Sequence, residues 1–257
     1  MISSSSNQRI KNLKKLMTDS RYRRQKNCFP VEGPRMFFEI PRDRILDCYM
    51  TESFARKYGD KIDKVPYELV DENLMRSLSD TRTPQGVIAL VRRQETGLEQ
   101  LLEGDGPFCF LVVENLQDPG NLGTMIRTGE GAGITGLILD RQSVDPYHLK
   151  VIRSTMGAIF RLPIVVADDL NPVCASLKNA GVTIYAGHLK GDSIYRADFR
   201  GSCAFLIGNE GKGLSQEIME QADRGIRIPM KGKLESLNAA VASTIIMYEV
   251  LRQREWT

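Results

Sequence analysis

The chain has 257 residues, of which 42% are hydrophobic and 26% are charged, and its formal net charge is +3. These values are ordinary for a globular protein that buries a core, and no run reaches the roughly 18 apolar residues of a membrane-spanning helix. The first residues lack the apolar core of a secretion signal. We therefore expect a cytoplasmic protein that has no membrane partner.

The cysteines and histidines argue against metal or triad chemistry. The five cysteines are scattered without a CxxC pair, and only two histidines are present. Isolated cysteines in a cytoplasmic protein are typical of free, packed thiols. Two histidines make a zinc site or a serine–histidine–aspartate triad a poor expectation, so we predict no bound metal.

Basic side chains are concentrated in the first 35 residues. Such a cluster can neutralise several phosphates, although it is equally compatible with a solvated face that has no ligand. Residues 1–8 are rich in serine and are expected to be disordered. In the cluster that follows, the candidate RNA contacts are Arg21, Arg23, Arg24 and Lys26.

Short elements alternate over residues 9–95. Apolar residues at helical spacing predict a helix over 9–19, and Asp71 is expected to cap a helix over 72–77. Pro30 confines the first strand to a sheet edge. The remaining helices are expected over 34–40 and 53–58, and the strands at 28–31, 44–50, 66–70 and 86–91. This pattern predicts a small α/β domain over 9–95, followed by a linker over 96–106.

The second half, residues 107–257, begins with a continuous apolar run, Phe108–Val113, which is typical of a buried parallel strand. Helices and apolar strands then alternate, which predicts an α/β domain with a parallel sheet. The further strands are expected at 136–139, 162–166, 182–186 and 203–207, and the helices at 122–131, 147–156 and 172–180.

Three segments place Gly, Asn, Arg and Glu directly after apolar strands, where open α/β sheets hold their ligands. They are Val113–Thr128, Phe205–Ser215 and Ile226–Ser243. Each also has a purely structural interpretation. Asn121 could cap a helix, the second segment could be a plain glycine-rich turn, and Ser236 could cap the helix that follows it.

A GxGxxG pattern at Gly131–Gly136 is not a dinucleotide motif. That motif must follow a strand and open a helix, whereas these glycines follow a predicted helix and precede a strand. We interpret them as the C-terminal cap of a helix.

Taken together and in this order, the three segments closely resemble the motifs of the SpoU (TrmH-type) family of RNA ribose methyltransferases. The matching residues are Asp118-Pro-Gly-Asn-Leu-Gly with Arg127-Thr, then Gly208-Asn-Glu-Gly-Lys-Gly-Leu, then Ile228-Pro-Met with Ser236-Leu-Asn. The match covers residues 108–252. The stretches Phe29–Gly33 and Thr83–Val87 also resemble that family's ribosomal-protein-like RNA-binding domain, though more loosely.

The resemblance implies a fold and a cofactor. It implies a parallel sheet whose C-terminal segment threads a loop as a deep trefoil knot (the SPOUT fold), in a methyltransferase domain over 107–257 that forms a homodimer. Residues 9–95 would then be the RNA substrate-binding domain. The implied cofactor is S-adenosylmethionine, bound by Ile207, Gly208, Gly213, Ile228, Met230, Leu237 and Asn238.

The resemblance also implies the catalytic residues Asn121, Arg127, Glu210, Ser236 and Asn238. Arg127 is either the base that activates a ribose 2′-hydroxyl or a clamp for an RNA phosphate that stabilises the developing alkoxide, and the rarity of a deprotonated guanidinium counts against the base. The expected substrate is 23S-type ribosomal RNA, because the first domain looks like a ribosomal protein. Transfer RNA as substrate, methylation of a base and an RNA-binding protein with little catalytic activity are the alternatives.

Overall fold

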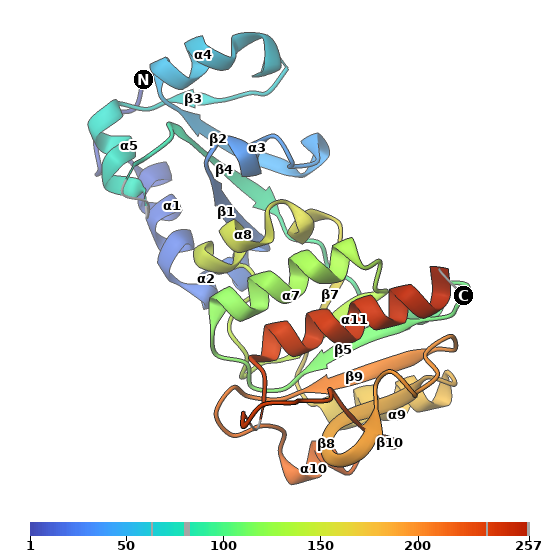
Figure 1. The fold of residues 1–257 in the computed structure, drawn as a ribbon. Helices are drawn as coiled ribbons and strands as arrows, with labels where there is room; N and C mark the ends of the chain where they lie inside the picture. Colours follow the sequence, from blue (N-terminus) through green and yellow to red (C-terminus); the bar gives the residue numbers. More distant parts are fainter. Residues whose placement is uncertain (63, 80–82, 235, 256–257) are drawn as a thin grey trace. The chain divides into compact units, whose positions relative to one another are not determined.

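The computed structural model describes residues 1–62, 64–79, 83–234 and 236–255 (Figure 1). The chain forms two compact units. Unit 1 comprises Met1–Gln94 with Pro146–Phe160, and unit 2 comprises Glu95–Asp145 with Arg161–Thr257. This division differs from the expected boundaries, because residues 146–160 were expected within the second domain and residues 96–106, which fall in unit 2, were expected as a linker between the domains.

The sheet of unit 1 has the strand order β1-β4-β2-β3. Strand β4 is antiparallel to both β1 and β2, whereas β3 is parallel to β2. Pro30 lies on the edge strand β1, as its missing N–H requires. The strands are β1 (Cys28–Glu32), β2 (Ile45–Met50), β3 (Glu68–Leu69) and β4 (Val87–Arg92).

The core of unit 1 explains why residues 146–160 belong to it. Ile10 and Leu13 pack in one cluster with Leu74 and with Leu149, and the ring of Tyr147 lies 4.6 Å from that of Phe29. The helices are α1 (Gln8–Thr18), α2 (Ser20–Lys26), α3 (Pro34–Phe37), α4 (Glu52–Ile62), α5 (Glu72–Leu78) and α8 (Leu149–Thr155), with 3₁₀ turns at Arg42–Arg44 and Ala158–Phe160.

The serine-rich start differs from the disorder that we expected. Ile2 lies beside the strand that leads to α5: its N–H donates to the carbonyl of Leu69 (2.6 Å), and its carbonyl accepts from the N–H of Asp71 (2.9 Å). The Asn7 side chain then caps α1 by accepting from the N–H of Arg9 (2.9 Å). These backbone partners outweigh the low hydrophobicity of the segment.

Unit 2 is built on a six-stranded sheet with the order β10-β8-β9-β5-β6-β7, in which every neighbouring pair is parallel. Strand β8 runs further than the expected 182–186, because its second half pairs with β10. The strands are β5 (Cys109–Val113), β6 (Gly136–Asp140), β7 (Ile164–Ala167), β8 (Thr183–Ser193), β9 (Cys203–Ile207) and β10 (Arg224–Arg227).

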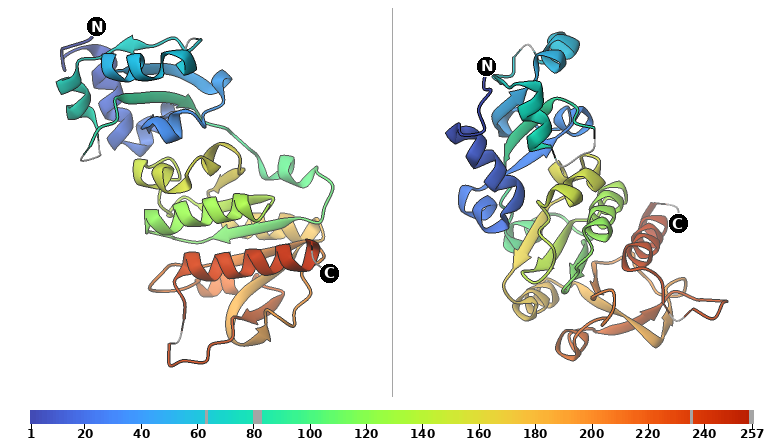
Figure 2. Two further views of the ribbon diagram at one scale, coloured as in Figure 1. Left: turned by 45° about the horizontal axis from the view of Figure 1, so that its top comes forward. Right: turned by 90° about the vertical axis from the view of Figure 1, so that its left-hand side faces the viewer.

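Helices cover this sheet in two groups. α6 (Leu98–Leu102), α9 (Leu170–Asn179) and α10 (Gln216–Met219) contribute to one apolar cluster with the strands. α7 (Pro119–Gly131) and α11 (Ala239–Glu255) lie side by side (Figure 2). The predicted C-terminal cap of α7 is confirmed, because the N–H of Gly133 donates to Glu130 and that of Ile134 donates to Gly129.

The five cysteines are free and buried, as expected. No helix within the described parts of the chain is long and apolar enough to cross a membrane.

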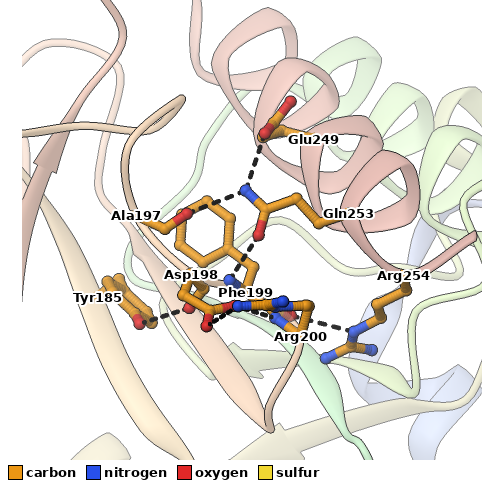
Figure 3. A network of polar contacts seen from close by, with 8 residues as sticks. All are labelled: Tyr185, Ala197, Asp198, Phe199, Arg200, Glu249, Gln253 and Arg254. Atoms are coloured by element: carbon orange, nitrogen blue, oxygen red, sulfur yellow. Dashed lines mark hydrogen bonds and ion pairs between the residues drawn. The ribbon is translucent and has the colours of Figure 1, made fainter. Parts of the chain in front are cut away.

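A polar network holds the C-terminal end of α11 (Figure 3). The amide of Gln253, which is only 8% exposed, donates to the carbonyl of Ala197 (3.0 Å) and accepts from the N–H of Phe199 (2.7 Å). The guanidinium of Arg254 donates to four backbone carbonyls. They belong to Pro107, Phe108, Phe199 and Gly201 at 2.8–3.2 Å. The helix is thereby tied to both the start of β5 and the segment before β9.

Candidate active site

One chain of hydrogen bonds joins the three motifs of unit 2. The amide Nδ2 of Asn238 donates to Oδ1 of Asn121 (3.0 Å), and Nδ2 of Asn121 donates to Oε1 of Glu210 (3.0 Å). These residues come from the third, first and second motif, respectively. One side chain from each segment therefore meets the others although they lie far apart in sequence, and we call this arrangement the relay.

The start of α7 leaves the Asn121 amide available for the relay. Asp118 is the cap of α7, since its carboxylate accepts from the N–H of Asn121 (2.7 Å), and Pro119 occupies the first helical turn, where no N–H partner is needed. The interpretation of Asn121 as a helix cap is therefore wrong. An aspartate followed by proline was the sequence signal for this cap.

Asn238 has two functions at the start of α11. Its Oδ1 accepts from the N–H of Ala240 (2.9 Å) and of Val241 (3.3 Å), so Asn238 rather than Ser236 caps the helix. Its Nδ2 points to Asn121 instead. One side chain thus couples the beginning of α11 to the relay.

The carboxylate of Glu210 accepts hydrogen bonds from three residues of the first motif. Besides the Asn121 amide, it accepts from the N–H of Asp118 (2.9 Å) and of Gln117 (3.2 Å). Partial burial alone would raise the pKa of Glu210, but the hydrogen bonds from Asp118, Asn121 and Gln117 outweigh it, and the pKa lies below its ordinary value of 4.5. Glu210 is therefore an ionised acceptor at neutral pH and holds the two loops together.

The glycine-rich loop is a tight turn that only glycine permits at two positions. A Cβ on Gly208 would lie 2.2 Å from the carbonyl carbon of Gly213, and Gly213 itself has a φ of +71°. Asn209 closes the turn: its backbone exchanges hydrogen bonds with Gly213, and its Oδ1 accepts from the N–H groups of Gly211 and Lys212. Sequence analysis did not single out Asn209, although such an Asx turn is a common role of asparagine before glycine.

The residues expected at the cofactor have the character that S-adenosylmethionine needs. Gly208, Ile228 and Leu237 are half-buried, and within the described chain their backbone N–H and C=O groups make no backbone hydrogen bond. Half-buried groups of this kind suit a ligand that brings its own donors and acceptors, as an adenine does. Ile207 is buried at the end of β9, and Met230 is 36% exposed.

Arg127 and Ser236 are exposed and stand outside the relay. No hydrogen bond or ion pair is formed by either side chain with the residues that the structure describes. Arg127 follows Asn121 on α7, one position before Thr128, whose hydroxyl accepts from Oγ1 of Thr244 on α11 (3.3 Å). The guanidinium is therefore accessible to an external anion.

A cavity of about 550 Å³ lies at the carboxyl ends of β5, β6 and β7. Among the predicted site residues only Gly213 lines it. Its charged lining has a single lysine, Lys212, against five carboxylates, which would repel RNA phosphates. The carboxylates are those of Glu114, Asp140, Asp168, Asp169 and Glu217. We therefore do not assign the reaction to this cavity.

The predicted RNA contacts in the basic cluster of unit 1 are not all exposed. Arg21, Arg24 and Lys26 are exposed, but Arg23 is only 2% exposed, and its guanidinium donates to the carbonyls of Leu16 (2.8 Å) and Met17 (3.3 Å). The prediction that Arg23 contacts RNA is therefore corrected. This guanidinium from α2 satisfies carbonyls that α1 leaves unpaired at its end.

Solved structures of similar chains define the class of protein. An rRNA methyltransferase from Sinorhizobium meliloti bound to AdoMet is 26% identical, with a TM-score of 0.85 over 100% of this chain and 98% of that one. The SpoU methyltransferase AviRb from Streptomyces viridochromogenes, in complex with AdoMet, is 27% identical, with a TM-score of 0.84 over 96% and 98%. The fold and the site together define an S-adenosylmethionine-dependent RNA methyltransferase.

The chain belongs to the SpoU rRNA methylase family, whose model matches residues 109–248, while an MRM3-like substrate-binding domain matches residues 7–89. Among similar sequences, the 23S rRNA (guanosine(2553)-2′-O)-methyltransferase RlmP of Bacillus subtilis is 32% identical over 97% of this chain and 98% of its own length. The 23S rRNA (guanosine-2′-O-)-methyltransferase RlmB of Bordetella pertussis is 30% identical over 83% and 86%.

Proposed function

We propose that this chain methylates a ribose 2′-hydroxyl of 23S-type ribosomal RNA in the cytoplasm. The relay carries the proposal, because it joins one side chain from each motif that the resemblance identified. The names of the two relatives given above support the choice of ribose and of 23S rRNA. A 2′-hydroxyl exists only in RNA, which is consistent with an RNA-binding unit on the same chain.

The difficulty of this reaction lies in the acceptor. S-adenosylmethionine supplies an activated methyl group on its sulfonium, whereas a ribose hydroxyl is a poor nucleophile until its proton is removed or its oxyanion is stabilised. Arg127 is exposed, so it binds a phosphate next to the target ribose and stabilises the developing negative charge, because a guanidinium makes a better clamp than a base. Ser236 and Asn238 orient the ribose from the start of α11.

The relay holds the loops that form the cofactor site. In this proposal the backbone groups of Gly208, Ile228 and Leu237 bind the cofactor, and Ile207, Gly213 and Met230 shape the surrounding turn. The loops converge because the C-terminal segment threads the chain as a trefoil knot. Gly208→Ala would push the turn apart, since the new Cβ would collide with the backbone of Gly213. Isothermal titration should then show S-adenosylmethionine affinity reduced at least tenfold.

The exposed guanidinium of Arg127 also supports a homodimer through the methyltransferase unit, in which Arg127 of one protomer completes the site of the other. Sedimentation equilibrium should give twice the chain mass of 28.9 kDa. Mixing Arg127→Ala with Asn238→Ala should restore part of the activity that each variant lacks. A monomer with full activity would exclude the shared site.

The proposed reaction is tested by transfer of tritium from labelled S-adenosylmethionine. Label should enter 23S rRNA, and nuclease digestion with mass spectrometry should locate the methyl group on a ribose. Label in transfer RNA alone, or on a base, would overturn the proposal. Removing the charge-stabilising group in Arg127→Ala should lower kcat about 100- to 1,000-fold, with unchanged cofactor affinity. Near-normal kcat in Arg127→Lys would exclude both roles considered for this residue.

A further inference from the structure

A second cavity, of about 300 Å³, lies entirely within unit 1. It is lined from β1 and α3 by Glu32, Arg35 and Met36, from the segment before β4 by Gln85, and from α8 by Arg153 and Met156. Its size is at the lower end of the range for small-ligand sites, about 300–1,000 Å³, and suits a ligand no larger than one nucleotide. The catalytic relay does not use any of these residues.

Two sequence stretches that the relay leaves unexplained form one wall of this cavity. They are Phe29–Gly33 and Thr83–Val87, and they meet where the N–H of Gly33 donates to the carbonyl of Val87 (3.1 Å). Gly33 has a φ of +91°, and a Cβ there would lie 2.9 Å from Oε1 of Gln85. The absence of a side chain at Gly33 therefore leaves room for the Gln85 amide at the wall of the cavity.

Another part of the lining comes from the end of α8, in an uncommon backbone conformation. Met156 has a φ of +51°, a left-handed conformation that is unfavourable for a residue other than glycine. Gly157 follows with a φ of +98°, and a Cβ there would lie 2.9 Å from Cγ of Glu39. This turn leaves the Met156 side chain 41% exposed at the cavity, so an apolar surface is presented there at an energetic cost.

The chemistry of the lining matches a nucleotide. Two guanidiniums, Arg35 and Arg153, stand against one carboxylate, so the cavity favours a phosphate, whereas the acidic cavity of unit 2 repels it. The carboxylate of Glu32, which also accepts from the hydroxyl of Ser79, and the amide of Gln85 offer acceptors and a donor to the edge of a base. Two methionine thioethers supply a soft apolar surface for the face of an aromatic ring.

We propose that this cavity holds one unpaired nucleotide of the RNA substrate. Arg35 and Arg153 bind its phosphate, Glu32 and Gln85 contact its base edge, and Met36 and Met156 contact its face. The inference rests on the proposed function, because it places an RNA on unit 1, and it adds a defined subsite that lies outside the catalytic relay. RNA-binding proteins read unpaired bases in this way because the base edges of an RNA helix are poorly accessible.

Steady-state methylation tests the subsite with Arg35→Gln and Arg153→Gln. Each should raise KM for rRNA about tenfold and leave kcat at saturating RNA and the affinity for S-adenosylmethionine unchanged. Arg56→Gln is the matched control, since this exposed arginine of unit 1 pairs with Glu52 away from the cavity. A KM that stays within twofold of the parent for both test variants, with thermal unfolding unchanged, would overturn the proposal.

A second measurement does not depend on methylation. In the full chain labelled with ¹³C-methyl methionine, single-stranded RNA hexamers should shift the methyl signals of Met36 and Met156 upfield through the ring current of a stacked base. The shifts should weaken in Arg153→Gln. Hexamers of uridine should shift these signals least, because uracil lacks the exocyclic amine that would donate a hydrogen bond to the Glu32 carboxylate. If these signals stay fixed while the same RNA shifts other methionines, the subsite is wrong even where methylation is normal. Shifts without any methylation would contradict the proposed function and leave the subsite standing.

Discussion

The two ends of α11 are held by hydrogen bonds of different kinds. At its beginning, the exposed Asn238 reaches other side chains through the relay and meets Asn121 and Glu210. At its end, Gln253 and Arg254 bind backbone carbonyls, and the Gln253 amide is almost fully buried (Figure 3). The same helix therefore combines a solvent-accessible junction between loops with a partly buried attachment to the sheet.

This difference predicts that the C-terminal end of α11 contributes mainly to stability, whereas its beginning contributes mainly to the reaction. Carbonyls that lose a buried charged donor leave an unsatisfied polar group, which is costly. Amides at an exposed junction can exchange their partners for water at little cost in stability. Substitutions at the end of α11 should therefore lower the free energy of unfolding, whereas those at its beginning should leave the protein folded but lower its activity.

The largest effect is expected for Arg254→Met. Four backbone carbonyls lose their donor at once, so the free energy of unfolding should fall by about 3 kcal/mol or more, measured by urea denaturation. Arg200→Met is the control, because Arg200 pairs with Asp198 at the exposed surface, where an ion pair contributes little to stability. Equal losses in the free energy of unfolding would show that the two kinds of contact contribute equally to stability.

The next largest effect is on activity, at the other end of the helix. Asn238→Asp keeps the oxygen that caps α11 but cannot donate to Asn121. Because a misplacement of about 1 Å can cost roughly 100-fold, kcat/KM should fall about 100-fold while stability stays within about 0.5 kcal/mol of the parent. Asn238→Ala should lose the same activity and, in addition, about 1 kcal/mol of capping energy. Full activity in the aspartate variant would show that the relay has no role in the reaction.

Glu210 allows the relay to be tested by pH. Because its pKa in the folded protein lies below 4.5, its ionised hydrogen bonds contribute stability above about pH 4.5, and this contribution is lost as pH falls through the folded-state pKa. Thermal unfolding should therefore show Glu210→Gln less stable than the parent at pH 7, with a gap that closes in acid. A gap that stays constant with pH would mean that the charge of Glu210 is not what holds the loops.

The smallest effect is expected in the middle of α11. Thr244→Val removes a long hydrogen bond to Thr128 and a bond to the carbonyl of Ala240, and it should lower the free energy of unfolding by about 0.5–1 kcal/mol. Thr124→Val, which removes only a bond to the carbonyl of Gly120 on an exposed face, should change it by less. A loss of stability comparable to that of Arg254→Met would show that the middle of α11, and not its C-terminal end, carries the main attachment of the helix.

Sequence predicted the features that depend on local pattern. β5, β6 and β9 lie within one residue of their predicted positions, because continuous apolar runs bounded by glycine or polar residues have few other conformations. The convergence of Asn121, Glu210 and Asn238 was also expected, from the resemblance of the three motifs.

Features that depend on distant partners could not be predicted. The second half of β8 has no apolar run and is a strand because β10 pairs with it. Arg23 has the composition of a phosphate contact, yet it is buried because the end of α1 leaves carbonyls beside it. Gln253 and Arg254 look like ordinary polar residues of a helix end, and only the fold brings Ala197 and Phe108 to them.

The inclusion of residues 146–160 in unit 1 changes how the two units are connected. The chain passes from one unit to the other three times, after Gln94, after Asp145 and after Phe160. A protease that cuts the segment around α6 would therefore divide unit 1 itself, leaving residues 1–94 as a separate chain held to residues 146–160 only by packing contacts such as that of Leu149. For the same reason, residues 1–94 expressed alone would lack Leu149 in their core. The substrate-binding domain matches residues 7–89 in sequence, whereas the compact unit that contains them also includes residues 146–160.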